Sequence, residues 1–358
     1  MKLKLQLRSL RWCISILMLS PSFLHSQTTF NKRFDWMGDM LGEQSFNIEQ
    51  TPTGFIVSRV GTPPVYDNWR FGFLMIDENG DMQGETAYAD SSILFALGWA
   101  NSGDHNDLGE YIGAGNMATT NGSYSFLVSY NEFGDTLFTK TYGVPEKIYV
   151  GYQSIFTNDG GSAITGYTTD FPEANTYVQC AYLLKYDASS EVEWIQKYTG
   201  QLKAMNARSV IQTSDGGYAI GGNVQYLNQN YVPYDIFVIK TDAEGNEQWR
   251  EYYGDVHSEL DAFLTETYDG NLVYCSKISN PDDNFFKFSY VCKISIEDGS
   301  IIWDRIFYSL FSSNESLVKS IELEDHSLVF AGRGAKRVYE DGELIGGTRG
   351  GQIIKKWC

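Results

Sequence analysis

The stretch from Thr213 to Tyr253 reads TSDGGYAIGGNVQYLNQNYVPYDIFVIKTDAEGNEQWREYY. β-Branched and aromatic residues are concentrated in runs, and Gly, Asp and Asn lie between those runs, which is the pattern of strands joined by turns. It predicts strands over Gly217 to Gly222, Asp235 to Thr241 and Gln248 to Tyr253, with a further strand, Arg208 to Gln212, before them. Four antiparallel strands make one sheet, which cannot bury both of its faces alone.

The same stretch contains two tight turns, Asp215-Gly216-Gly217 and Asp242-Ala243-Glu244-Gly245. Glycine favours such turns because it takes positive φ without strain. The second turn lacks the alternating ligand spacing of a calcium loop, so we expect its Asp side chain to bond its own backbone. We expect the ring of Trp249, four residues after Gly245, to cover neighbouring strands.

Both turns recur along the chain. Gly160, Gly216, Gly270 and His326 mark the first turn at spacings of 56, 54 and 56 residues, with Gly54 two periods earlier. Gly80, Gly134, Gly245 and Gly299 mark the second at spacings of 54, 111 and 54. Two independent markers with one period indicate a repeat architecture. An aromatic residue follows the second turn at Phe138, Trp194, Trp249 and Trp303.

The copies run over about 45–90, 91–144, 145–200, 201–255, 256–309 and 310–358. In the second copy, a longer polar stretch, Asn101 to Asp107, replaces the first turn. The last copy ends at its third strand, Gln352 to Cys358. Residues 28–37 resemble a fourth strand, so they would pair the open edge of the last sheet and close a ring. The sequence therefore predicts an all-β, six-bladed β-propeller of four-stranded blades, with seven blades as the alternative count.

Residues 1–26 have the features of a secretory signal peptide. Lys2, Lys4, Arg8 and Arg11 precede an apolar run, Cys13 to Leu19, which is too short to span a membrane. The rest, 27–358, is expected to be one propeller domain, secreted or in the cell envelope. Cleavage would remove four positive charges and shift the formal net charge from −18 to −22. Such acidity argues against nucleic acid or an anionic membrane as partner, and no other stretch suits a transmembrane helix.

The cysteines and histidines indicate no metal site or catalytic centre. Cys275 and Cys292 fall on neighbouring strands of one copy, where a cross-strand disulfide and two separate buried thiols are equally compatible with the sequence. No Cys or His spacing is typical of zinc, and His105, His257 and His326 lie far apart in sequence. We therefore assign no catalytic, cofactor or metal-binding residue.

The run D-G-G-[YS]-A-I-[GT]-G, the strand D-x-F-x-I-K-x-D and the turn D-x-x-G-x-x-x-W resemble secreted propeller-repeat proteins of Bacteroidetes over nearly the whole mature chain. The resemblance implies the architecture and no activity. Members of that group often carry a C-terminal sorting domain for type IX secretion, and this sequence ends at Trp357-Cys358 instead. The D-x-x-G-x-x-x-W turn is also similar to the repeat of pyrroloquinoline-quinone dehydrogenases, which would imply a quinone cofactor. Those enzymes usually have eight blades, however, and no cofactor-contacting motif occurs here.

The connections between second and third strands are long and variable, and they share one face of a propeller. They include Gly61 to Trp69, Thr168 to Tyr177, Asn223 to Tyr234, Ser279 to Phe286 and Arg333 to Arg349. We expect any glycan or protein ligand to bind this loop face, because function concentrates in irregular loops. The candidate contacts are aromatic: Tyr66, Trp69, Phe171, Tyr177, Tyr226, Tyr231, Tyr234, Phe285 and Phe286. The alternative is that these rings pack within their own loops.

Three functions remain open at this point. A non-enzymatic propeller for binding, adhesion or surface scaffolding predicts no cluster of ionisable groups in the central channel. An enzyme acting on an extracellular polymer, of glycosidase or lyase type, predicts facing acids or a His–acid pair around a deep central pocket. A quinone-dependent dehydrogenase predicts bound cofactor.

Overall fold

A computed structural model describes residues 41–62, 70–88, 94–98, 102–171, 178–200, 203–226, 234–254, 259–279, 287–307, 316–340 and 343–357. The predicted leader and closing strand lie outside these residues. The described residues form strands and turns and contain no helix. Among them there is accordingly no helix long and apolar enough to cross a membrane.

The strands form six antiparallel sheets, numbered here in chain order. Sheet 1 contains β1 (Leu41–Thr51), β2 (Gly54–Thr62), β3 (Arg70–Asp77) and β4 (Met82–Tyr88). Sheet 2 contains β5 (Leu94–Leu97), β6 (Gly103–His105), β7 (Glu110–Thr119), β8 (Gly122–Asn131) and β9 (Thr136–Tyr142). Sheet 3 contains β10 (Tyr149–Phe156), β11 (Ser162–Thr168), β12 (Cys180–Tyr186) and β13 (Val192–Tyr198).

Sheet 4 contains β14 (Lys203–Gln212), β15 (Tyr218–Tyr226), β16 (Asp235–Thr241) and β17 (Glu247–Tyr253). Sheet 5 contains β18 (Glu259–Glu266), β19 (Leu272–Ser279), β20 (Lys287–Ile294) and β21 (Ile301–Phe307). Sheet 6 contains β22 (Ser316–Glu322), β23 (Leu328–Glu340) and β24 (Glu343–Trp357).

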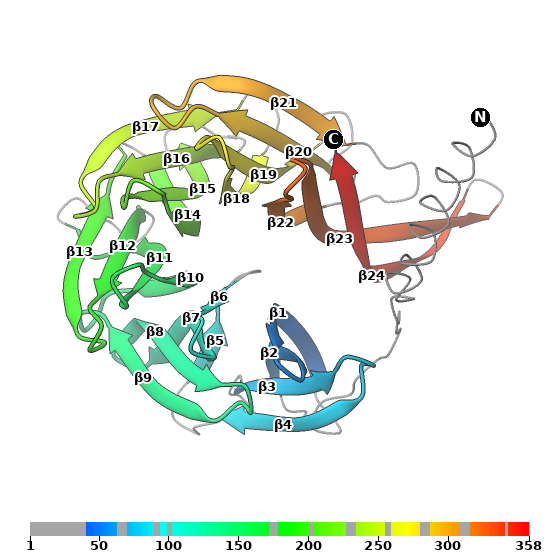
Figure 1. Ribbon diagram of the computed structural model, residues 1–358, viewed down its shortest axis with the longest axis horizontal. Helices are drawn as coiled ribbons and strands as arrows, with labels where there is room; N and C mark the ends of the chain where they lie inside the picture. Colours follow the sequence, from blue (N-terminus) through cyan, green and yellow to red (C-terminus); the bar gives the residue numbers. More distant parts are fainter. Residues whose placement is uncertain are drawn as a thin grey trace, which may run out of the picture.

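The sheets follow one another around a common centre, with the first strand innermost and the last outermost (Figure 1). In sheet 2, β5 and β6 share the innermost position. Apolar clusters fill the spaces between consecutive sheets; one of them joins Ile155 and Leu183 of sheet 3 to Ile220 and Phe237 of sheet 4. The all-β propeller prediction is confirmed. The described residues form six sheets, and the number of blades in a closed ring stays a prediction.

The second sheet corrects one detail of the sequence reading. A first turn is present there, because Asn106 Oδ1 accepts hydrogen bonds from the N–H groups of Leu108 and Glu110, both at 3.0 Å. Gly109 takes the left-handed position with φ 77°. The innermost strand is interrupted instead, as β5 and β6 both pair with β7. Leu108 stands where the first turns of sheets 3 to 6 have Asp, which hid the turn, although Gly109 lies 55 residues after Gly54.

Sheet 6 corrects another expectation. The connection from Arg333 to Arg349 is not an irregular loop, because β23 and β24 continue in antiparallel register until Glu340 lies opposite Glu343. Two register shifts allow this long ribbon to bend. The ribbon extends away from the ring in Figure 1. Within the described residues this sheet has three strands and β24 forms its edge, and the predicted fourth strand, 28–37, lies outside them.

Cys275 and Cys292 are separate buried thiols. Cys275 lies opposite Val291 and Cys292 lies opposite Tyr274, so the two cysteines are one register step apart. Successive side chains point to opposite faces of a sheet, and accordingly Cys275 packs towards sheet 6 while Cys292 packs towards sheet 4. Both are free, as is buried Cys180. Of the two alternatives, the structure has the separate thiols.

The two ends of the channel are built differently. Turns between first and second strands and between third and fourth strands lie on one face, called here the turn face. In the second turn of sheet 4, Asp242 Oδ1 accepts from the N–H groups of Glu244 and Asn246 at 3.1 and 2.8 Å, which confirms the expected turn chemistry. The opposite face, called the loop face, carries longer connections such as those between β11 and β12 and between β15 and β16.

Candidate functional site

Polar side chains at the ends of the innermost strands bind the first turns of the preceding sheets. The donors are backbone N–H groups of exposed turn residues. Gln212 Oε1 accepts from the N–H of Asn158 at 2.8 Å, and Glu266 Oε2 accepts from the N–H of Ser214 at 2.8 Å. Glu322 accepts in the same way from the N–H of Tyr268. Each acceptor ends the innermost strand of one sheet and bonds the first turn of the preceding sheet, so it links two sheets.

A cavity of about 400 Å³ lies at the centre of the ring. Its walls come from β6, β10, β14, β18 and β22, the innermost strands of sheets 2 to 6. The lining combines apolar residues such as Ile155 and Phe263 with polar ones, including Asp104, Gln212, Glu266 and Lys319. Since Asn158, in a first turn, also lines it, the cavity lies at the turn-face end of the channel.

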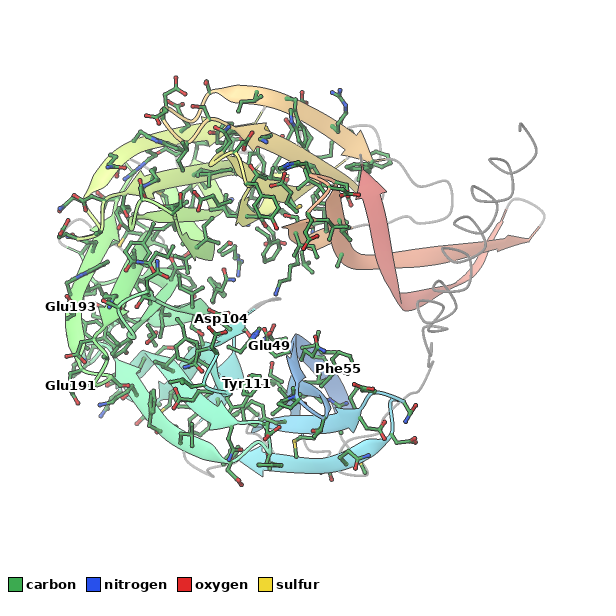
Figure 2. All side chains as sticks on the ribbon, in the orientation of Figure 1. Glu49, Phe55, Asp104, Tyr111, Glu191 and Glu193 are labelled. Atoms are coloured by element: carbon green, nitrogen blue, oxygen red, sulfur yellow. The ribbon has the colours of Figure 1, made fainter. Side chains whose placement is uncertain are left out.

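Two acids and a histidine meet beside this cavity. Figure 2 shows Glu49 of β1 and Asp104 of β6 near the centre, whereas Glu191 and Glu193 lie on the outer rim. His105 Nδ1 lies 2.8 Å from Glu49 Oε2, and Asn47 donates to Glu49 Oε1 at 2.9 Å. Asp104 Oδ2 accepts from the N–H of Phe156 at 2.9 Å. Burial raises the pKa of Asp104, the Phe156 N–H opposes this, and the charge of Glu49 adds to it.

Ionisable groups therefore gather at the channel, which the enzyme hypothesis predicted and the non-enzymatic hypothesis did not. These acids also have a structural use, because Asp104, Glu266 and Glu322 accept hydrogen bonds from backbone N–H groups of a neighbouring sheet. An ionisable cluster in such a channel has a structural use, and its presence alone does not distinguish binding from catalysis.

A second charged group involves the innermost strands of sheets 3, 4 and 5. The Arg208 guanidinium lies 4.0 Å from the centroid of the Tyr152 ring, and its Nε lies 3.6 Å from Asp261 Oδ1. Arg208 stands at a register shift in β14, where a bulge re-aims a side chain. Burial raises the pKa of Tyr152 to about 12, against the opposing effect of Arg208. Asp261 takes φ 63°, a strained conformation for a non-glycine residue, and its N–H donates to Asn223 Oδ1 at 2.7 Å.

The repeated Asp of the first turn binds a third-strand lysine in three consecutive sheets, and that lysine is buried in sheets 3 and 4 and partly buried in sheet 5. Lys185 Nζ lies 2.7 Å from Asp159 Oδ2, Lys240 Nζ lies 2.8 Å from Asp215 Oδ2, and Lys293 Nζ lies 2.7 Å from Asp269 Oδ2. Burial of a charge is costly unless it is paired. These aspartates therefore connect the first turn to the third strand and are structural parts of each sheet.

Three of the nine predicted aromatic contacts lie within the described residues. Phe171, Tyr226 and Tyr234 are all half-buried. Burial, followed by the nearby Asp235 carboxylate, raises the pKa of Tyr226 to about 12. Tyr226 and Tyr234 flank the connection between β15 and β16, whereas Phe171 follows β11 of sheet 3. These three rings therefore do not form one exposed aromatic patch. Tyr66, Trp69, Tyr177, Tyr231, Phe285 and Phe286 lie outside the described residues.

The histidines do not gather in one site. His105 belongs to the channel group, His257 lies outside the described residues, and His326 occupies a first turn with φ 62°, where other sheets have glycine. In the described part of the chain, no three His, Cys, Asp or Glu residues are placed to share a metal ion.

No family model matches the chain, and no curated protein matches it. Among solved structures it is similar to the Dos1 propeller, at 13% identity and a TM-score of 0.48, over 82% of this chain and 66% of that one. It is similar to polysaccharide lyase Uly1 at 12% identity and a TM-score of 0.48, over 86% and 76%. The parainfluenza virus 5 hemagglutinin-neuraminidase ectodomain has 9% identity and a TM-score of 0.43, over 99% and 95%. No residue role is transferred at these values, and the fold rests on the strand pairing.

Proposed function

We propose that this chain is an extracellular or envelope β-propeller that binds a glycan or a protein ligand on its loop face without chemical turnover. The observation that carries the proposal is the difference between the two faces. On the turn face, repeated side-chain and backbone hydrogen bonds close short turns. On the loop face, eight residues separate β15 from β16 and seven separate β19 from β20, and such loops can vary without disturbing the sheets.

The channel chemistry supports binding over catalysis. A general acid or nucleophile must reach the substrate with its reacting atom. Here Asp104 Oδ2 holds the Phe156 N–H, and both Glu266 oxygens accept from Ser214, through its N–H and its hydroxyl. These hydrogen bonds of Asp104 and Glu266 join neighbouring sheets.

A second candidate is an enzyme acting on an extracellular polymer. The observation in its favour is the Glu49–His105 pair next to Asp104, whose raised pKa suits a proton donor. In this alternative, the substrate would enter the central cavity from the turn face, opposite the loops.

One experiment separates the two functions. The intact protein is screened on a glycan and peptide array, and bound polymers are then incubated with it and assayed for new reducing ends or unsaturated products. Binding without turnover, lost in Trp69→Ala and Tyr231→Ala and retained in the turn-face control Phe133→Ser, is the expected result. Turnover that Asp104→Asn abolishes would establish the enzyme instead, because the asparagine carbonyl can still accept the Phe156 N–H.

A further inference from the structure

Tyr268 departs from its counterparts in the repeat. The equivalent position of the first turn is Asn158 in sheet 3 and Ser214 in sheet 4, both small and polar. The Tyr268 side chain is 65% exposed. Its turn is firmly built, because Thr267 Oγ1 donates to Asp269 Oδ1 at 2.7 Å and the Tyr268 N–H is bound by Glu322. The ring meets His326 edge to face, with centroids 5.7 Å apart.

A groove of about 510 Å³ runs beside this ring between sheets 5 and 6. We call it the Tyr268 groove, and its main lining residues are Ser214, Thr265, Glu266, Tyr268, Ile321 and Glu322. Ile321 is 47% exposed there and gives an apolar wall. Thr265 and Glu266 also line the central cavity, so the groove and the cavity meet on the turn face.

The groove is lined by acids. Glu266 and Glu322 line it, and no described lysine or arginine does. His326 Nδ1 lies 3.2 Å from Glu322 Oε1, whose side chain is 10% exposed, and Lys319 lies on the cavity side of the junction. A cation is attracted both to carboxylates and to the face of an aromatic ring. The formal net charge of −18 for the whole chain adds a long-range attraction for positive ligands.

We propose that the Tyr268 groove binds a basic, extended segment of a partner protein, with a lysine or arginine side chain over the Tyr268 ring and beside Glu322. The apolar wall at Ile321 contacts the methylene part of that side chain, since long cationic side chains pack their stems on apolar surface. The Tyr268 groove lies on the turn face and not on the loop face, so this proposal is tested independently of the proposed function.

The test measures the binding of fluorescein-labelled octalysine to the intact protein by fluorescence polarisation. Tyr268→Ser and Tyr268→Asn place in this turn the residues found in sheets 4 and 3, so the turn is expected to form in both. We expect each to weaken binding about two- to fivefold, the range for a cation–π contact at an exposed site. Tyr268→Phe keeps the ring and should bind as the unaltered protein does.

The matched control is Phe133→Ser, which removes a ring that is 61% exposed in another turn of the same face. Octalysine binding that falls equally in Tyr268→Ser and Phe133→Ser would overturn the proposal, because the attraction would then be general. Uncharged cellohexaose serves as a second probe. If cellohexaose binding depends on Tyr268 and octalysine binding does not, the groove is a carbohydrate site and the proposal is wrong.

Charge is tested separately with Glu322→Gln, whose amide oxygen can still accept the Tyr268 N–H. We expect weaker octalysine binding and a smaller dependence on salt concentration than in the control Glu297→Gln, which changes an exposed acid in the second turn of sheet 5. An equal effect of the two substitutions would mean that Glu322 is not part of the site. Thermal unfolding of every variant confirms that the sheets are intact.

Discussion

At the scale of single residues, the most informative groups are the repeated aspartates that a motif search would take for ligands. Asp159 binds Lys185, the hydroxyl of Thr157 and the N–H of Gly161. Lys185 is 3% exposed, so the aspartate, together with Glu193 at 3.2 Å, neutralises a buried charge. The D-G-G signature thus follows from the packing of a lysine on the third strand.

This pairing predicts a pH dependence of stability. Burial opposes ionisation of Asp159, but the hydrogen bonds from Lys185, Thr157 and Gly161 outweigh it and lower its pKa to about 2. A carboxyl group with a depressed folded-state pKa stabilises the fold above its unfolded pKa of about 4, and that contribution is lost as the pH falls to about 2. We expect Asp159→Asn to lower the urea midpoint at pH 7. The gap between the urea midpoints of the variant and the unaltered protein should then close as the pH falls from about 4 to about 2.

The control for that measurement is Asp107→Asn, which removes one exposed charge from a first turn. A constant difference between Asp159→Asn and the unaltered protein from pH 7 down to pH 2 would contradict the assignment, because it would show that the ionised carboxylate is not what stabilises the turn.

At the scale of elements, a tyrosine on the outer strands of sheets 1, 3 and 4 bonds the second turn of the next sheet. Tyr198 donates its hydroxyl to the Gly245 carbonyl at 2.8 Å, and Tyr253 donates to the Gly299 carbonyl at 2.6 Å. Trp249 Nε1 donates to the Ile296 carbonyl at 2.8 Å. The recurring aromatic residue therefore acts between sheets, where sequence reasoning expected it to cover neighbouring strands.

A comparison of two glycines in sheet 4 distinguishes the cost of backbone strain from the cost of a clash between sheets. Gly216 has φ 87° and open space where a Cβ would lie, whereas Gly245 has φ 76° and a Cβ there would lie 2.7 Å from the Trp194 ring. We expect Gly216→Ala to lower the free energy of unfolding by about 1–2 kcal/mol, the cost of a left-handed non-glycine residue. Gly245→Ala should cost clearly more, because the methyl group also displaces the ring.

Urea unfolding of the two variants under identical conditions measures the difference. Equal losses of stability would contradict this prediction. They would show that the Trp194 ring can shift at no cost in free energy to make room for the methyl group, although it packs closely against the Gly245 turn.

At the scale of the molecule, the sheets depend on one another for burial, since the apolar clusters lie between sheets. An edge such as β24 in the described residues exposes unpaired backbone groups. The sequence predicts that residues 28–37 pair there, and this closure stays a prediction.

Deletion of residues 1–37 is expected to lower the midpoint of thermal unfolding by several degrees relative to deletion of residues 1–26 and to increase self-association, because an open edge remains. Differential scanning calorimetry and light scattering measure the two effects. A shared midpoint and a shared monomeric state would show that residues 28–37 are not the closing strand.

The sequence by itself determined the repeat, the strands and the kind of architecture. Gly160, Gly216 and Gly270 mark one turn with one period because left-handed backbone is cheap only for glycine, and strand patterns such as Asp235 to Thr241 are local. Local chemistry could also predict that Asp242 bonds its own turn.

Only the tertiary structure decided how groups far apart in sequence meet. It placed Glu49 beside His105 and Asp104 at the channel, separated the faces on which Cys275 and Cys292 lie, and joined Glu322 to Tyr268 along the groove. Residues about 50 positions apart become neighbours only when sheets stack around an axis, and the register of that stacking depends on bulges and burial rather than on any single motif. For that reason the sequence directed attention to the loop face, whereas the cavity and its exposed tyrosine lie on the turn face.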